Sequence, residues 1–242
     1  REGYGDLLAQ GQKAAAKHFG SAAIDKVDQV KGLAPHAYEF RAYKSAALGQ
    51  AVGHRGDPLP LRVNLLEVDW HHAPEWFQSV AAQQFGSEEA AIPSSYQGKA
   101  LATIISEHME RVPDNMGVCK WLYGLFLFQD VERVTAFFNL VTGKELEVPQ
   151  ILKISERVRN LERMFDVRQG LRRADDALPK KFFEQPLKKG RYKGAVLERE
   201  KFEQMKDEYY TLRGWDKSTG VPTRDKLEEL GLKDVADQVL DK

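Results

Sequence analysis

The chain has 242 residues, of which 42% are hydrophobic and 30% charged, and its 36 basic and 36 acidic residues give a formal net charge of zero. This composition is typical of a soluble globular protein with a sizeable core, and it lacks the basic excess of a nucleic-acid-binding domain. No apolar run approaches the about 20 residues that a membrane-spanning helix needs. One cysteine and no secretory signal exclude an internal disulfide and favour a reducing, cytoplasmic location.

The chain opens on REGYGDLL, without an initiating methionine, and leads directly into a helical pattern. We therefore expect it to be part of a longer protein or a processed product.

In the first half of the chain, apolar residues recur at helical spacing between glycine- and proline-rich segments. Small residues dominate 42–52, which predicts a tightly packed helix. Pro74 fits the first turn of a helix, and Pro113 is expected to end another. We predict helices over 5–18, 42–52, 74–85 and 97–112, with loops over 32–38 and 53–61.

The second half shows the same periodicity, with Gly143 and Gly231 as helix ends and Thr223 as an N-cap. We predict helices over 122–128, 130–142, 149–166, 198–212 and 224–230, a short helix after Gly231, and irregular structure over 168–183, 186–194 and 214–222. No alternating run is long enough to predict a strand. The predicted fold class is therefore mainly α, an irregular multi-helix arrangement.

The helix over 149–166 combines an apolar face with many charges. Its apolar side chains are Ile151, Ile154, Val158, Leu161 and Phe165. The arginines, balanced by nearby acids, indicate a salt-bridged helix surface, although arginine also binds phosphate bidentately. The basic residues of this region are Arg157, Arg159, Arg163, Arg168, Arg172 and Arg173.

Cys119, in DNMGVCKW, is the single cysteine. Taken alone, it is typical of a small buried hydrophobic residue. As a thiolate ligand of an iron–sulfur cluster it would need three further cysteines from outside this chain. A nucleophile needs an adjacent base and orienting group, and His108, eleven residues upstream, supports nothing specific.

His71 and His72 follow Asp69 and are the strongest histidine-based metal candidate. Adjacent side chains diverge, however, and no third partner lies at helical spacing. The segment is more typical of a loop that enters the helix at Pro74.

Four stretches carry a resemblance: YGDLLAQG (4–11), DNMGVCKW (114–121), RNLERMFDVRQGLRRADDALPKKF (159–182) and YYTLRGWDKSTGVPTRDKLEELGL (209–232). In order and spacing they resemble the C-terminal part of the tungsten-containing aldehyde:ferredoxin oxidoreductases, over nearly the whole chain. The resemblance implies that 1–40 is the tail of the middle helical domain and 41–242 the C-terminal helical domain. The family's N-terminal pterin-binding β domain, with its other cluster cysteines, is absent from this chain.

The resemblance implies roles for the D-x-x-G-x-C segment, in which Asp114, Gly117 and Cys119 match. Asp114 would hydrogen-bond a pterin ring, and Gly117 and Val118 would let the backbone approach the cofactor. Cys119 would be the fourth ligand of a [4Fe–4S] cluster. The implied cofactors are a tungsten (or molybdenum) bis-pterin and this cluster, both shared with residues outside the chain.

A second family pattern, R-G-x-x-H followed by a basic residue, is only partly present in HRGDPLPLR, which ends at Arg62. Arg55 matches, and Arg62 could reach a pterin phosphate. Leu59 or Pro60 stands where the family has a proton-transferring histidine, so that His54 is the remaining candidate for the catalytic residue. The DDALP turn, 175–179, could line the substrate passage or simply end a helix.

The implied activity is interconversion of an aldehyde, or a related carbonyl or acyl substrate, and a carboxylic acid at tungsten. Electrons would leave through the cluster to ferredoxin or a partner iron–sulfur subunit. The implied partners are the N-terminal half or a separate chain that carries it, and a homo-oligomer is possible. The alternative is a non-catalytic helical subunit, or degenerate paralogue, that is retained for assembly.

Overall fold

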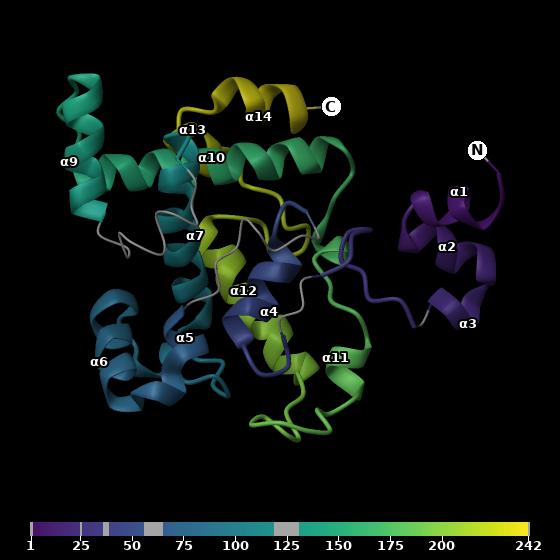
Figure 1. Ribbon diagram of the computed structural model, residues 1–242. Helices are drawn as coiled ribbons and strands as arrows, with labels where there is room; N and C mark the ends of the chain where they lie inside the picture. The colour runs from purple at the N-terminus through teal and green to yellow at the C-terminus, as the bar shows by residue number, and fades with distance from the viewer. Residues whose placement is uncertain (1, 25, 36–38, 56–64, 119–130, 242) are drawn as a thin grey trace.

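The computed structural model describes residues 2–24, 26–35, 39–55, 65–118 and 131–241 (Figure 1). Within these ranges every regular element is helical, and the only β pairings are the isolated bridges Val30–Leu33 and Trp215–Pro222. The predicted mainly α fold class is confirmed. Across the same ranges, no helix combines the length and apolar character that crossing a bilayer requires.

The N-terminal helices are α1 (Gly3–Ala9), α2 (Gln12–Phe19) and α3 (Ser21–Ile24), which pack on one another at one side of the molecule (Figure 1). The single helix predicted over 5–18 is wrong, because the chain turns between α1 and α2. Gly11 stands at this turn with φ +90°, a conformation that is open to glycine and strained for other residues. The predicted domain boundary near residue 40 stays a prediction.

Four helices form the centre: α4 (Lys44–Val52), α7 (Lys99–Asn115), α10 (Val148–Arg168) and α12 (Arg199–Arg213). α7 contacts each of the other three. Every residue of α4 is buried, as its small side chains predicted. The main core includes Ala47, Leu48, Ala100, Phe202 and Tyr210.

Shorter elements surround this centre. α5 (Leu65–Asp69), η1 (Trp70–His72), α6 (Pro74–Phe85) and η2 (Glu88–Ala91) share a separate apolar cluster. α13 (Arg224–Glu229), whose N-cap Thr223 accepts from the Lys226 amide as predicted, and α14 (Lys233–Val239) lie beside α10. The remaining elements are α9 (Val131–Thr142), η3 (Arg173–Asp175) and α11 (Lys181–Glu184). The helix predicted over 122–128 lies outside the described residues.

Pro113 does not end α7, which continues to Asn115. Proline lacks the amide that would donate to the carbonyl four residues earlier, but only two helical residues follow it, so the lost bond falls at the helix end. The carbonyl groups of Val112 and Pro113 both accept from the Met116 amide, at 3.2 and 3.1 Å. Asp114 is therefore a helical residue.

α10 buries its polar side. Arg159, Asn160 and Arg163 are fully buried, whereas Leu161 and Phe165 of the predicted apolar face are 45% and 56% exposed. The prediction of an exposed arginine surface is thus wrong for Arg159 and Arg163. Burial of these charges is stable only because acidic partners on other elements face them.

The start of α4 is held by a distant carboxylate. Glu67 accepts from the backbone amides of Lys44 (2.6 Å) and Ser45 (3.0 Å), which supplies the cap that α4 lacks from its own flanking residue. Lys99 pairs with Glu67 at 2.9 Å, and both side chains are completely buried. Lys99 also donates to the carbonyls of Ala90 and Ile92, both at 2.9 Å. α4, α5 and α7 are therefore joined at one buried ion pair.

We expect Lys99→Met to destabilise the fold by about 3–5 kcal/mol, because it leaves the Glu67 carboxylate buried without its charge partner. The change is measured as a lower midpoint of urea unfolding. The matched control is Lys201→Met, which removes an exposed ion pair with Glu198 and should cost less than about 1 kcal/mol. Equal losses for the two variants would contradict a structural role for the buried pair.

Candidate functional site

The end of α7 carries the D-x-x-G-x-C motif. The amide of Gly117 donates to the carbonyl of Asp114 (3.1 Å), and that of Val118 to the carbonyl of Pro113 (2.9 Å). This pairing is a Schellman motif, with Gly117 at φ +71° as the left-handed residue. Gly117 is therefore required by the turn itself. A Cβ at Gly117 would meet no atom of the described residues within 4 Å.

The end of α4 carries the other candidates, His54 and Arg55. The guanidinium of Arg159 donates to the carbonyl of Val52 at 2.8 Å, which satisfies one of the unpaired carbonyls at this helix end and complements its negative dipole. The His54–Arg55 segment therefore begins beside a carbonyl that is held by a buried arginine of α10.

One cavity of about 350 Å³ joins the two motifs. It brings together His54, Arg55 and Asp114, which are up to sixty positions apart in sequence. Its lining residues are His54, Arg55, Arg111, Asp114, Asn115, Val158 and Glu162. Arg62 and Cys119, together with Leu59 and Pro60, lie outside the described residues, whereas Gly117 and Val118 form the turn directly after Asp114 and Asn115.

The cavity wall holds opposite charges in contact. Glu162 forms an ion pair with Arg111, and one of its oxygens lies 3.7 Å from Nδ1 of His54. Burial lowers the pKa of His54 to about 4. The charge of Glu162 opposes this shift, and three cations add to it: Arg159, Arg111 and Arg55. His54 is consequently a neutral imidazole at physiological pH.

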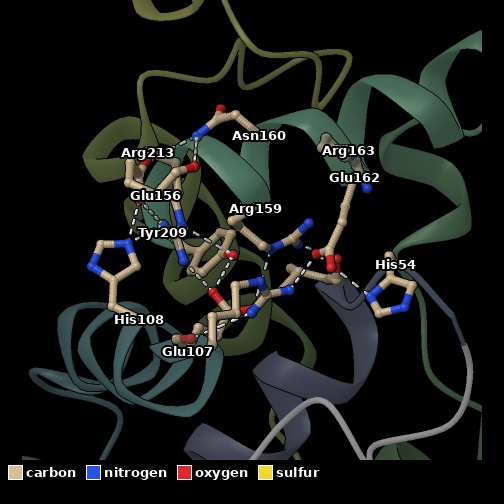
Figure 2. A network of polar contacts seen from close by, with 12 residues as sticks. His54, Glu107, His108, Glu156, Arg159, Asn160, Glu162, Arg163, Tyr209 and Arg213 are labelled. Carbon is tan, nitrogen blue, oxygen red and sulfur yellow. Dashed lines mark hydrogen bonds and ion pairs between the residues drawn. The ribbon is translucent and has the colours of Figure 1, made fainter. Parts of the chain in front are cut away.

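A network of buried charges underlies the cavity and connects α7, α10 and α12 (Figure 2). Glu107 pairs with Arg213 and with Arg159 (3.4 Å), and it accepts from the hydroxyl of Tyr209 (2.7 Å). Glu156 pairs with Arg213 and contacts His108. Sequence reasoning missed this network, because its charges are spread over three helices and only their burial distinguishes them from surface pairs.

The guanidinium groups also stack on aromatic rings. Those of Arg159 and Arg163 each lie 4.9 Å from the ring centre of Trp215, and the Trp215 indole donates to Asn160 at 2.8 Å. Arg163 makes a bidentate pair with Asp176 at 3.0 and 2.7 Å. Asp176, in the DDALP turn, is therefore a buried structural partner, while its neighbour Asp175 lines a separate cavity near Lys31.

The histidine pair His71–His72 lies in η1, with ring centres 3.9 Å apart. No group of three possible metal ligands occurs in the part of the chain that the structure describes. η1 ends at His72 and α6 begins at Pro74, so these residues lead into α6 as predicted.

Glu107 makes the stability of the protein pH-dependent. Burial alone would raise its pKa, but the charges of Arg213, Arg159 and Arg111 outweigh burial and lower the pKa from 4.5 to about 2. Because the folded pKa is below the unfolded one, the stabilisation is complete above pH 4.5 and is lost as the pH falls toward 2.

We expect the free energy of unfolding to decrease by on the order of 3 kcal/mol across this interval through Glu107. Urea unfolding at a series of pH values measures it. Glu107→Gln should be less stable at pH 7 and show a shallower decrease below pH 4.5. The control Glu229→Gln, at an exposed pair with Lys226, should retain the parental pH dependence. If the free energy of unfolding of Glu107→Gln depended on pH as that of the parental protein does, Glu107 would not be the source of the pH dependence.

Comparison with known proteins places these motifs in a family. Residues 1–232 match the family model described as aldehyde ferredoxin oxidoreductase, domains 2 and 3. The tungsten-containing aldehyde ferredoxin oxidoreductase of Pyrococcus furiosus is 30% identical over 235 residues, 96% of this chain and 35% of that protein. A P. furiosus protein described as an aliphatic sulfonate oxidoreductase, WOR-like subunit, is 27% identical over 99% of this chain and 34% of its own length.

A solved structure shares the fold. It is described as the active-site complex BamBC of benzoyl coenzyme A reductase with 1,5-dienoyl-CoA, and it aligns with a TM-score of 0.73 and 22% identity. The match covers 98% of this chain and 38% of that one. The chain thus spans about a third of the length of its curated relatives. It belongs to the aldehyde ferredoxin oxidoreductase family, as the part that corresponds to domains 2 and 3.

Proposed function

We propose that this chain is part of a tungstopterin and iron–sulfur oxidoreductase that interconverts carboxylic acids with aldehydes or related carbonyl or acyl compounds. The observation that carries the proposal is the shared cavity, which is lined by Asp114 at the end of α7 and by His54 and Arg55 after α4. The family assignment supports the tungsten cofactor, since several curated relatives are tungsten-containing enzymes.

The residues present fit a pterin cofactor. Asp114 lines the cavity, and a carboxylate can accept from the N–H groups of a pterin. The open space at Gly117 leaves room for close approach. Arg111 is almost fully buried in the cavity wall, yet its Nε has no hydrogen-bond acceptor among the described residues. An acceptor group of a ligand would satisfy this donor.

Each residue then has a separate task. Asp114 orients the pterin, Gly117 and Val118 shape the backbone against it, and Arg55 and Arg62 bind its phosphate. Cys119 supplies one thiolate of a [4Fe–4S] cluster whose other ligands come from outside this chain. The bound tungsten, or molybdenum, supplies the two-electron redox chemistry. Electrons would pass through the cluster to ferredoxin or a partner iron–sulfur subunit, in the cytoplasm.

Exposed apolar side chains on α9 and α10 support the need for further protein. On α9, Phe137, Leu140 and Val141 are 60%, 83% and 70% exposed. On α10, Leu161 and Phe165 are exposed, and Val158 of the same helix lines the cavity. Exposed apolar groups of this size mark interaction surfaces. We propose that the N-terminal half, in the same or a partner chain, covers these exposed side chains and completes the site. A homo-oligomer would be a further way to cover them.

A second candidate is a non-catalytic subunit that keeps the fold for assembly. It is favoured by the absence of histidine at the R-G-x-x-H position, where the sequence has Leu59 and Pro60. The cavity-lining Asp114 and the retained cysteine oppose it, since α7 could end in a Schellman turn without either of them.

We expect the isolated full-length protein or complex to contain tungsten (or molybdenum) and about four irons per chain, the content of one cubane cluster. Cys119→Ala should abolish the cluster's electron paramagnetic resonance signal. Asp114→Asn should weaken retention of the metal about 10- to 100-fold, as loss of a supporting carboxylate does at metal sites. Elemental analysis and spectroscopy measure both.

The matched control is Asp234→Asn, at an exposed acid in the first turn of α14, which should retain parental metal content. Parental protein that lacks tungsten, molybdenum and iron would favour the non-catalytic subunit. Equal metal loss in Asp114→Asn and Asp234→Asn would remove Asp114 from the site.

A further inference from the structure

The Glu162 carboxylate contacts two walls of the cavity. It lies on α10, pairs with Arg111 on α7, and faces Nδ1 of His54 after α4 at 3.7 Å. Arg111 precedes Asp114 by one helical turn. One side chain therefore touches the element that carries Asp114 and the segment that carries His54.

Among the described residues, the main charges that act on His54 are Glu162 and Arg159 from α10, Arg111 from α7, and Arg55 from its own segment. Asp114 lines the same cavity. Burial, with the surrounding cations adding to its effect, lowers the pKa of His54 and keeps the imidazole neutral. A neutral imidazole has one N–H and one lone pair. The Glu162 carboxylate, which only accepts, lies 3.7 Å from Nδ1, and this charge favours the tautomer with the proton on Nδ1 and the lone pair on Nε2.

We propose that Glu162 is a positioning residue that fixes the tautomer of His54, so that Nε2 serves as the proton acceptor of the site. This inference rests on the proposed function. In it, His54 takes the place of the histidine that is missing from the R-G-x-x-H pattern. The carboxylate that orients an imidazole in hydrolytic triads works by the same physical principle.

The role is consistent with the stoichiometry of the reaction. When an aldehyde and water form a carboxylic acid, the aldehyde C–H bond breaks and a C–O bond forms, with release of an electron pair and a pair of protons. A tungsten centre held by the whole protein would supply the two-electron oxidant, with a ferredoxin-type protein as the final acceptor. His54 takes one proton from the attacking water or the aldehyde hydrate and returns it to solvent, and the second proton leaves directly to solvent.

His108 shows why the geometry of His54 is distinctive. His108 also contacts a carboxylate, that of Glu156, but the same Nε2 atom lies 2.7 Å from the guanidinium of Arg213. It therefore belongs to the buried network, and it does not line the cavity. His54 combines a carboxylate contact with a position on the cavity wall.

The test is Glu162→Gln in the full-length enzyme. The amide oxygen of glutamine would accept from Arg111, so its NH₂ group would face Nδ1 of His54 and favour the opposite tautomer. Nitrogen-15 NMR of histidine-labelled protein, with the His54 signals assigned by their loss in His54→Gln, reads the tautomer directly. We expect the proton to move from Nδ1 to Nε2, and kcat to fall about 10²- to 10⁴-fold with little change in KM.

His54→Gln should lower kcat to a similar extent, and the double variant should be no worse than either single one, because the two residues act as a unit. The matched control is Glu203→Gln, which removes a carboxylate partner of Arg173 elsewhere on the molecule, and it should leave the tautomer and kcat unchanged. An unchanged His54 tautomer in Glu162→Gln, or losses that multiply in the double variant, would overturn the inference.

The NMR result also separates this inference from the proposed function. Suppose that the parental protein contains tungsten and that Glu162→Gln changes the tautomer of His54. If His54→Gln then leaves kcat unchanged, the proton-acceptor role is overturned. If the protein contains neither tungsten nor molybdenum, the proposed function is overturned, and with it the catalytic assignment of His54. A changed tautomer in Glu162→Gln would in that case still identify Glu162 as the residue that orients His54.

Discussion

The fold depends on the burial of arginine between helices. Arg159 contacts Glu107 on α7, the end of α4 through the Val52 carbonyl, and the face of Trp215. A planar guanidinium offers several donors in fixed directions and a flat face for stacking, which a lysine ammonium does not. Removing either partner of such a pair would leave a charge in a region without water. The mutual arrangement of the central helices is therefore specified by polar contacts as well as by apolar packing.

This arrangement determines where the candidate site can form. α7 and α4 each end in a segment that lines the cavity, and both are attached to α10 a few residues from those ends. The start of α4 is fixed separately by Glu67. A cofactor bound between the two segments would meet walls that are already in place, so little binding energy would be spent on ordering them.

Much of the helical architecture was predictable, because it rests on local signals. Pro74 and Phe85 bound α6 as its pattern indicated, and small residues marked α4 as buried. The errors had two causes: local backbone geometry at Pro113 and Gly11, and contacts between elements on α10. Pro113 was tolerated in a last turn, and Gly11 divided a helix that its apolar spacing left continuous. On α10, the exposed Leu161 and Phe165 and the buried Arg163 reverse the usual interpretation of an amphipathic helix.

For the site, the motif residues Asp114, His54 and Arg55 were identified from sequence, and their common cavity follows from the fold. Glu162 and Arg111 could not have been identified in this way. Nothing in their sequence neighbourhood separates them from the other charged residues of long helices, and their importance comes from contacts between elements 51 residues apart.

The buried ion pairs also carry a thermal consequence. The hydration free energy of charged groups becomes less favourable as temperature rises, so the penalty for removing them from water decreases. A core that is held together by Glu107, Arg159 and Arg213 should therefore lose less of its cohesion on heating than a purely aliphatic core of the same size.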